Sequence, residues 1–236
     1  MKKLLTDKKN QLLLLLSILF LIKIPQEEVR FTLWVLGGII IAMISDVLIK
    51  RLFFRKKIVP TSAAISGFIV AGIINYQQPW FVLVIFSLLA IISKNVIKHK
   101  NRHVFNPANF ALFVATAFGV PLTWSIESNV YIIIVFGVYM AYSIRKLTHV
   151  LGFLVLFSSL CLLKDVNPLM LVSWFFVFVM LIEPKTSGAG YLRGAVFGCI
   201  AGVVSFIVFT FFPRYDFFVS GLFVANLISG FKPKIH

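Results

Sequence analysis

Apolar segments separated by short polar gaps occupy almost the whole chain. We count ten of them, and their lengths of about 14 to 23 residues suit helices that cross or enter a bilayer. The pattern therefore predicts an all-α polytopic membrane protein with about ten transmembrane helices. The segments lie at about 11–24, 31–49, 61–75, 79–93, 106–120, 129–144, 147–163, 167–182, 190–212 and 215–231.

Basic residues concentrate in every second gap between these segments. If the N-terminus is inside, all but four of the 23 Lys+Arg residues lie on the inner side. The exceptions are Lys23, Arg30, Lys164 and Arg214. Because such a bias orients helices during insertion, the sequence predicts a multi-pass protein of the prokaryotic inner cell membrane with both termini in the cytoplasm.

Composition supports a single integral membrane domain over residues 1–236. The chain is 60% apolar with a mean hydropathy of +0.98, whereas soluble domains are about half apolar. The net charge of +15 comes from short loops beside apolar segments, which indicates contact with anionic lipid of the bilayer rather than with nucleic acid. The basic, apolar N-terminus lacks a small-x-small cleavage site, so we expect a retained first span. Cys161 and Cys199 lie inside apolar segments, which indicates packing, and we predict no metal site.

The third and fifth segments are too short to cross a membrane unaided. About 15 residues give a helix of about 22 Å, whereas the hydrocarbon core is about 30 Å thick. Proline opens or interrupts them at Pro60 and Pro107, and glycine interrupts the third at Gly67 and Gly72. We therefore expect broken or re-entrant helices, which are tolerated only where protein or a polar cavity surrounds them and which mark binding sites in transporters.

Two short internal echoes indicate repeats, but they imply different symmetries. Residues 107–110 (PANF) echo residues 224–227 (VANL) across five crossings, which fits an inverted repeat of about 11–120 and about 129–231. Residues 61–62 and 186–187 are both Thr-Ser and lie six crossings apart, which implies a parallel relation. The sequence alone leaves both alternatives open.

The strongest polar cluster is the run from Glu183 to Gly190, between the eighth and ninth segments. Thr186 or Ser187 could cap the next helix and leave backbone N–H groups free for an anion or a polar ring edge. The alternative is a capped cytoplasmic turn, with Glu183 and Lys185 in water.

A second cluster contains Asn106, Pro107 and Asn109, at the inner end of the fifth segment. An asparagine offers both a donor and an acceptor, so the pair could recognise an amide-like edge, or it could simply tie down the loop. Thr61 and Ser62 after Pro60 allow the same two interpretations, with a plain helix cap as the simpler one.

Two charged residues lie inside apolar segments near the expected inner interface. Asp46 precedes Lys50 by four positions, which permits an ion pair on one helix face. Lys94 ends the fourth segment and could extend to the lipid head groups. The alternative for Asp46 and Lys94 is a place on an ion path.

At these residues the chain resembles the NqrB/RnfD family, membrane proteins of the sodium-pumping NADH:quinone oxidoreductase and of Rnf electron-transport complexes. The resemblance covers most of the chain, and its specific parts are the Phe-Asn-Pro-Ala run and the acid-Pro-x-Thr-Ser run, in that order. The matching positions are Asp46, Pro60-Thr61-Ser62, Gln78-Pro79-Trp80, Lys94, Phe105-Asn106-Pro107-Ala108, Glu183-Pro184, Thr186-Ser187 and Asn226.

The resemblance implies ten helices in two inverted repeats, similar to urea transporters, that hold flavin beside redox partner proteins. Family members carry FMN on a threonine of an outer loop after the fifth segment. The equivalent loop here, residues 121–129, lacks that motif, and the run 186–190 has glycine where the acceptor hydroxyl should be. We therefore predict a non-covalent flavin, either riboflavin or FMN. The predicted cofactor-binding residues are Thr61, Ser62, Asn106, Pro107, Asn109, Glu183, Thr186, Ser187 and Asn226, and Asp46 and Lys94 are assigned to an ion path.

The first functional hypothesis is therefore a flavin-binding membrane component of an Rnf-like electron-transport system, which transfers electrons and is coupled to ion translocation. We assign no catalytic side chain. The alternative from another class is a permease or channel for flavin or a small polar solute, and a third is a non-catalytic assembly protein. The sequence is compatible with a homo-oligomer.

Overall fold

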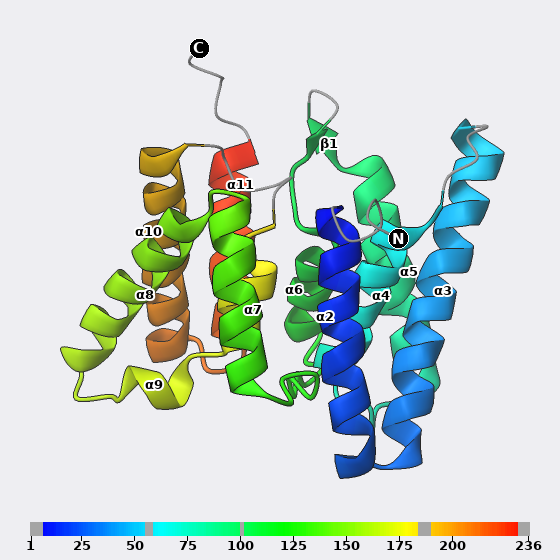
Figure 1. The fold of residues 1–236 in the computed structure, drawn as a ribbon, viewed down its shortest axis with the longest axis horizontal. Coiled ribbons are helices and arrows are strands. Elements are labelled where there is room, and N and C mark those ends of the chain that lie inside the picture. The colour runs from blue at the N-terminus through cyan, green and yellow to red at the C-terminus, as the bar shows by residue number, and fades with distance from the viewer. Residues whose placement is uncertain (1–6, 55–58, 100–101, 184–189, 231–236) are drawn as a thin grey trace. The chain divides into compact units, whose positions relative to one another are not determined.

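The computed structural model describes residues 7–54, 59–99, 102–183 and 190–230 (Figure 1). In this part of the chain nearly all regular structure is helical. Two-residue strands β1 (Lys98–His99) and β2 (Arg102–His103) pair antiparallel as a small hairpin. The chain divides into two compact units, which are described separately: unit 1 is Met1–Val96 with Phe110–Asn129, and unit 2 is Ile97–Asn109 with Val130–His236.

Unit 1 is built around a long helix, α3, which packs against both α4 and α5. The two backbones of α3 and α4 meet closely where Gly38 faces Gly67, because a Cβ on Gly67 would collide with the Gly38 carbonyl group and with Ala42. Small residues at such a crossing are the usual way for membrane helices to approach. The elements of unit 1 are α2 (Lys8–Lys23), η1 (Ile24–Gln26), α3 (Val29–Phe54), α4 (Thr61–Ile73), α5 (Trp80–Val96) and the larger part of α6 (Pro107–Ala117).

The loop after α6 folds back onto the C-terminal end of α4. The backbone N–H of Thr123 donates to the Ile73 carbonyl at 2.8 Å, and that of Ile126 donates to the Gly72 carbonyl at 2.9 Å. The Ser128 hydroxyl also donates to the Leu19 carbonyl of α2 at 2.9 Å. The first two bonds satisfy carbonyl groups at the end of α4 that the helix itself leaves unpaired.

Unit 2 is centred on α10, which packs against α8 and α11; α8 and α10 lie side by side in Figure 1. Four buried aromatic rings fill the space between α8, η2 and α11, with neighbouring ring centroids 4.8 to 6.1 Å apart: Phe153, Phe157, Phe176 and Phe218. The helices of unit 2 are α7 (Val130–Ser143), α8 (Leu147–Leu162), α9 (Pro168–Leu171), the π-helix η2 (Phe176–Met180), α10 (Tyr191–Phe211) and α11 (Phe217–Gly230).

Three helical stretches in the described residues are long and apolar enough to cross a membrane: Lys8–Gln26, Val29–Leu52 and Tyr191–Phe211. On α3, large apolar side chains four residues apart are exposed, from Leu36 through Ile40 and Ile44 to Leu48. A continuous exposed apolar stripe of this kind is typical of a surface covered by lipid. The chain is therefore an all-α membrane protein, and the number of crossings beyond these three stays a prediction.

The helices expected to be short are short, but the predicted glycine break is wrong, because α4 runs without interruption through Gly67 and Gly72. α4 has 13 residues and α6 has 11, which gives lengths of about 20 Å and about 16 Å. The structure adds a break that the sequence did not indicate. α9 ends at Leu171, the chain is non-helical at Val172–Ser173, and the following helical turns are of the π type. Residues 172–182 are nevertheless buried, apart from half-buried Trp174.

Candidate functional site

An irregular, buried stretch of backbone leads into α6 and lies along α11. Val104 and Phe105 are buried without regular secondary structure. Val104 lies against Gly230, where an added Cβ would come within 2.6 Å of the valine. The Phe105 ring stacks on Phe223 with centroids 4.7 Å apart. The stretch therefore runs antiparallel to α11, from its C-terminal end toward its start.

The two asparagines at the start of α6 hold this arrangement in place. The side-chain oxygen of Asn106 accepts from the backbone N–H of Asn109 at 3.1 Å, which is the bond of an N-cap residue. Pro107, also buried, follows as the first helical residue, where a missing N–H costs nothing. The Asn109 amide donates to the Val219 carbonyl of α11 at 3.1 Å. These asparagines therefore do tie down the loop, as one of the two interpretations expected.

Asn226 joins the same place from α11. It lies three residues after Phe223 and four before Gly230, so it belongs to the helix stripe that contacts residues 104–109. Its side chain is 0% exposed. Among the described residues, neither its amide nitrogen nor its amide oxygen has a hydrogen-bond partner, and the side-chain oxygen of Asn109 has none either.

Unpartnered amide atoms at full burial are costly, because each forfeits about 1–3 kcal/mol of solvation without compensation. Two further buried hydroxyl groups in unit 2, those of Ser205 and Ser220, also find no partner among the described residues. Such groups in a native fold call for an explanation, and a bound polar ligand is one. The predicted residues Asn106, Pro107, Asn109 and Asn226 are thus brought together. We call this set the asparagine site.

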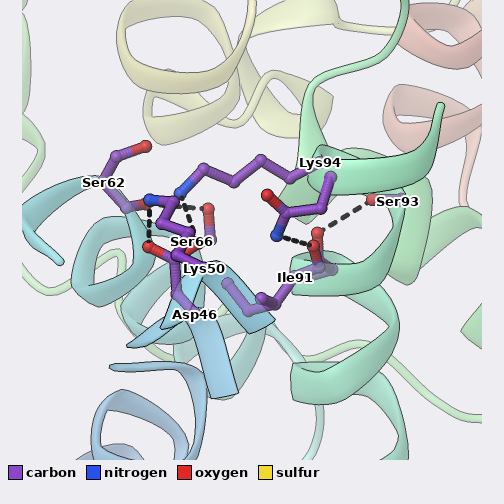
Figure 2. Close-up of polar contacts among 9 residues, drawn as sticks. Asp46, Lys50, Ser62, Ser66, Ile91, Ser93 and Lys94 are labelled. Atoms are coloured by element: carbon purple, nitrogen blue, oxygen red, sulfur yellow. Dashed lines mark hydrogen bonds and ion pairs between the residues drawn. The ribbon is translucent and has the colours of Figure 1, made fainter. Parts of the chain in front are cut away.

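A cluster of charged residues lies inside unit 1. Asp46 on α3 forms ion pairs with Lys50, one turn further along, and with Lys94 of α5, whose Nζ lies 3.4 Å from the carboxylate. Figure 2 shows the two lysines meeting at Asp46 beside Ser62 and Ser66 of α4. The ion pair predicted between Asp46 and Lys50 is confirmed.

Two sequence interpretations in this region are wrong. Lys94 does not extend to a lipid surface: its side chain is only 6% exposed, because Asp46 draws it inward. Thr61 and Ser62 do not cap α4 with their hydroxyls, since the helix is preceded by Pro60 and has no side-chain cap. Ser62 contributes its carbonyl instead, which accepts from the Ser66 hydroxyl at 3.1 Å.

The Glu183 motif is described only in part. Glu183 is half-buried and follows η2 in unit 2. Thr186 and Ser187 lie outside the described residues. Helix α10 begins at Tyr191, and its N-cap is Gly190 with a φ of 105°, a conformation that favours glycine.

Sequence reasoning missed a buried basic pair in unit 2. Lys146 precedes α8 and His149 lies in its first turn, and their Nζ and Nε2 atoms are 3.1 Å apart. Burial lowers the pKa of Lys146 to about 8. The available signal was a Lys-x-x-His spacing at the start of an apolar segment, which places both side chains on one helix face.

Neither the asparagine site nor the charged clusters form a metal centre of ordinary composition, since the described His, Cys, Asp and Glu residues include no group of three that could hold an ion. Neutral amides are the polar groups of the asparagine site, and these suit a polar organic ligand. The chain matches no protein-family model, and no curated protein is similar enough to count as a relative.

Proposed function

We propose that this protein is a flavin-binding membrane component of an Rnf-like electron-transport system, with the flavin held non-covalently at the asparagine site. The observation that carries the proposal is the fully buried Asn226 amide, whose two polar atoms have no partner among the described residues. A membrane protein can hold irregular backbone and unpaired amides at such a place if they surround a ligand.

The side chains present fit one edge of the flavin ring. The pyrimidine edge of an isoalloxazine alternates acceptors and a donor, and a carboxamide offers the matching donor and acceptor. The side-chain oxygen of Asn109, which has no partner among the described residues, adds an acceptor, and the positive end of α6 favours a ring carbonyl. The flavin itself would supply the capacity to accept and release electrons. The chain's part is to hold the ring edge and exclude water.

The order of the elements supports the accompanying fold proposal of two inverted five-helix repeats, similar to urea transporters. In unit 1, α3 packs against α4 and α5, and α2 packs against α4; in unit 2, α8 packs against η2 and α10, and α7 packs against η2. These pairs occur in the same order in both units, with α4 and η2 as the short elements, whereas the packing of α4 on α5 and of α10 on α11 has no counterpart of similar extent. One of the three sequence boundaries between the units, Asn129–Val130, lies close to the expected start of the second repeat, whereas residues 97–109 of the expected first repeat belong to unit 2.

The alternative proposal, a permease for flavin or a small polar solute, draws on the loop at residues 121–129. This loop lacks the FMN-bearing motif of the NqrB/RnfD family, and its backbone N–H groups donate to carbonyl groups at the end of α4. A protein without an attached flavin can still use the asparagine site to pass a neutral solute. Redox partner proteins and an ion path through Asp46 and Lys94 belong to the first proposal only.

The visible spectrum of the protein purified in mild detergent tests the two proposals. The electron-transport proposal predicts a yellow protein that dithionite bleaches and whose chromophore is released by acid. The permease proposal predicts a colourless protein that accelerates uptake of riboflavin or of a small amide into liposomes. A colourless protein without uptake activity would contradict both.

A further inference from the structure

Two helices of unit 2 are short and are not enclosed by protein. α7 has 14 residues and α8 has 16, which gives lengths of about 21 Å and about 24 Å, whereas the hydrocarbon core of a bilayer is about 30 Å thick. The short helix α4 is buried at ten of its 13 residues, so neighbouring protein compensates for its length. α7 and α8 each leave one side exposed, so their shortness has to be accommodated by whatever covers that side.

The exposed side of α7 is a stripe with a tyrosine at each end and two valines between them. Its members are four, three and four residues apart, which places them on one helix face, and all are exposed: Tyr131, Val135, Val138 and Tyr142. The two tyrosines are about 17 Å apart along the helix axis. Tyrosine is enriched where a membrane meets water, because its ring is apolar and its hydroxyl is polar. The pattern therefore indicates a side that faces lipid and has both ends at head-group level.

The exposed side of α8 has a similar extent. Its large apolar side chains lie on one face: Leu151, Val155 and Leu162. Ser159 on the same face donates its hydroxyl to the Val155 carbonyl at 2.8 Å, so this polar group does not require water. The exposed charged residues Arg145 and Lys164 lie just beyond the two ends of the helix. They mark the limits of the surface that α8 can present to hydrocarbon, because a charged side chain there is costly.

Longer helices do not conflict with a thin bilayer beside α7 and α8. α3 has 26 residues and α10 has 21, and a helix longer than the hydrocarbon core can tilt at modest cost. A shorter helix cannot extend itself. If α7 kept to one leaflet of a bilayer of ordinary thickness, the hydroxyl of either Tyr131 or Tyr142 would lie in hydrocarbon, whereas a locally thinner bilayer keeps both hydroxyls among the head groups.

We propose that the exposed sides of α7 and α8 bind a locally thinned bilayer, and that this surface favours phospholipids with short acyl chains. The surface is apolar between its polar ends, so it fits acyl chains rather than a charged ligand. The proposal takes from the sequence analysis that both helices cross the membrane. It does not depend on a flavin at the asparagine site, and the two proposals can fail independently.

Spin labels on α7 measure the depth of its exposed side. Full-length protein with Cys161 and Cys199 replaced by alanine receives a single cysteine in place of Tyr131, Val135 or Tyr142 and is reconstituted into dioleoyl-phosphatidylcholine vesicles. Accessibility of each label to oxygen, which dissolves in hydrocarbon, and to a water-soluble nickel chelate gives its depth. The labels at 131 and 142 should lie at head-group level, and the label at 135 should lie in hydrocarbon.

Two results of the depth measurement would overturn the proposal. A label at position 131 or 142 that lies deep in hydrocarbon would mean that the bilayer does not adapt to α7. Labels that are immobilised and inaccessible to both reagents would mean that a protein partner or a second copy of this chain covers this side instead of lipid.

Acyl-chain length supplies an independent test. Thermal unfolding is compared in vesicles of dimyristoleoyl-, dioleoyl- and dierucoyl-phosphatidylcholine, which share a head group and differ in chain length. The unfolding temperature of the wild type should fall by about 2–4 °C from the shortest chains to the longest, because mismatch grows with thickness. An equal or higher unfolding temperature in the longest chains would overturn the proposal.

Tyrosine variants connect this preference to α7. The double variant Tyr131→Leu with Tyr142→Leu removes the polar group at each end of the stripe, so its preference should shift toward longer chains. Tyr139→Leu is the matched control, because it makes the same change at an exposed position of the same helix between the ends of the stripe, and it should keep the wild-type order. An unchanged order in the double variant would contradict the role given to the tyrosines.

Discussion

The unpartnered polar atoms of Asn226 should lower the stability of the ligand-free protein and should also hold the proposed ligand. Replacement of Asn226 by leucine keeps the branching of the side chain and removes a buried amide that costs about 1–3 kcal/mol while it is unpartnered. We therefore expect Asn226→Leu to leave the thermal stability of the ligand-free protein unchanged or raised, and to abolish flavin retention. Absorbance at the flavin band and thermal unfolding in detergent measure the two effects.

A matched control for Asn226→Leu is Ser87→Ala. Ser87 on α5 is also 0% exposed, and its hydroxyl has no partner among the described residues. This variant removes a buried polar group from unit 1, so flavin retention should stay at the wild-type level. If Asn226→Leu retains flavin as fully as Ser87→Ala does, Asn226 does not contact the cofactor.

The burial of Lys146 predicts a stability that depends on pH. Its folded pKa of about 8 lies below the ordinary value of 10.5, so between these values the unfolded chain binds a proton that the folded chain does not. Stability must therefore rise with pH through this window, and below it the cost of burial is fully present. We expect Lys146→Met to be more stable than the wild type near neutral pH, with a difference that shrinks toward alkaline pH.

Thermal unfolding from pH about 7 to about 10 measures this dependence. Because methionine cannot titrate, the variant curve should be flatter than that of the wild type. Lys164→Met, which removes an exposed lysine of the same unit, is the control, and its curve should run parallel to the wild-type curve. If the stability curve of the Lys146 variant also ran parallel to the wild-type curve, Lys146 would not be the cause of the pH dependence.

Distance along the chain decided which residue contacts the sequence could predict. The Asp46–Lys50 pair follows from a four-residue spacing on one helix. Lys94 reaches the same carboxylate from 48 positions away, and the Asn109 amide reaches Val219 from 110 positions away. Such contacts depend on helix packing, which one sequence does not encode in any local pattern. Asn226 was assigned to the same site through the resemblance to the NqrB/RnfD family and not through a local pattern.

At the scale of the elements, close packing of α8 against α10 depends on glycines spaced four residues apart on α10. A Cβ on Gly198 would collide with backbone atoms of His149 and Phe153, whereas one on Gly202 would lie 3.1 Å from the Phe153 carbonyl oxygen. We expect Gly198→Ala to lower the free energy of unfolding by about 1–3 kcal/mol, the usual cost of overpacking. Gly202→Ala should be near neutral, since a gain in helix propensity of about 1 kcal/mol offsets the tighter contact.

Unfolding of both glycine variants in detergent, followed by circular dichroism, measures the difference between them. Both substitutions are the same chemical change on one helix, so the paired comparison removes any general effect of alanine. Equal stability of the two variants would mean that α8 and α10 are not packed as closely as the glycine contacts require.

Composition predicted some helix breaks and not others for a definite reason. α4 and α6 are short because proline opens them and their apolar segments are brief, and both signals are visible in the sequence. The break at Val172–Ser173 carries neither proline nor glycine and sits within an apolar run. The Ser173 hydroxyl accepts from the Phe176 N–H at 3.0 Å and so starts the next helical turns. A serine within an apolar segment is too common to predict a helix break.

The whole molecule is a membrane protein, and the proposed inverted repeat makes the orientation of its loops the decisive test. If all ten segments cross the membrane, three crossings separate the turn at Gln77 from the turn at Arg145, and one more separates the latter from Lys164. Because basic residues are retained on the inner side, we expect Gln77 and Lys164 outside and Arg145 inside. All three residues are exposed.

Single cysteines at these three positions, in full-length protein with Cys161 and Cys199 replaced by alanine, report the side directly. A membrane-impermeant maleimide added to intact cells should label Gln77→Cys and Lys164→Cys, and Arg145→Cys should react only after the membrane is permeabilised. Labelling of Arg145→Cys alone would mean that the protein has the opposite orientation, and it would contradict the role of the basic loops. Labelling of Gln77→Cys and Arg145→Cys from the same side would require an even number of crossings between these two positions. Two inverted repeats of five crossings each place three crossings between them, so this outcome would exclude the five-plus-five arrangement.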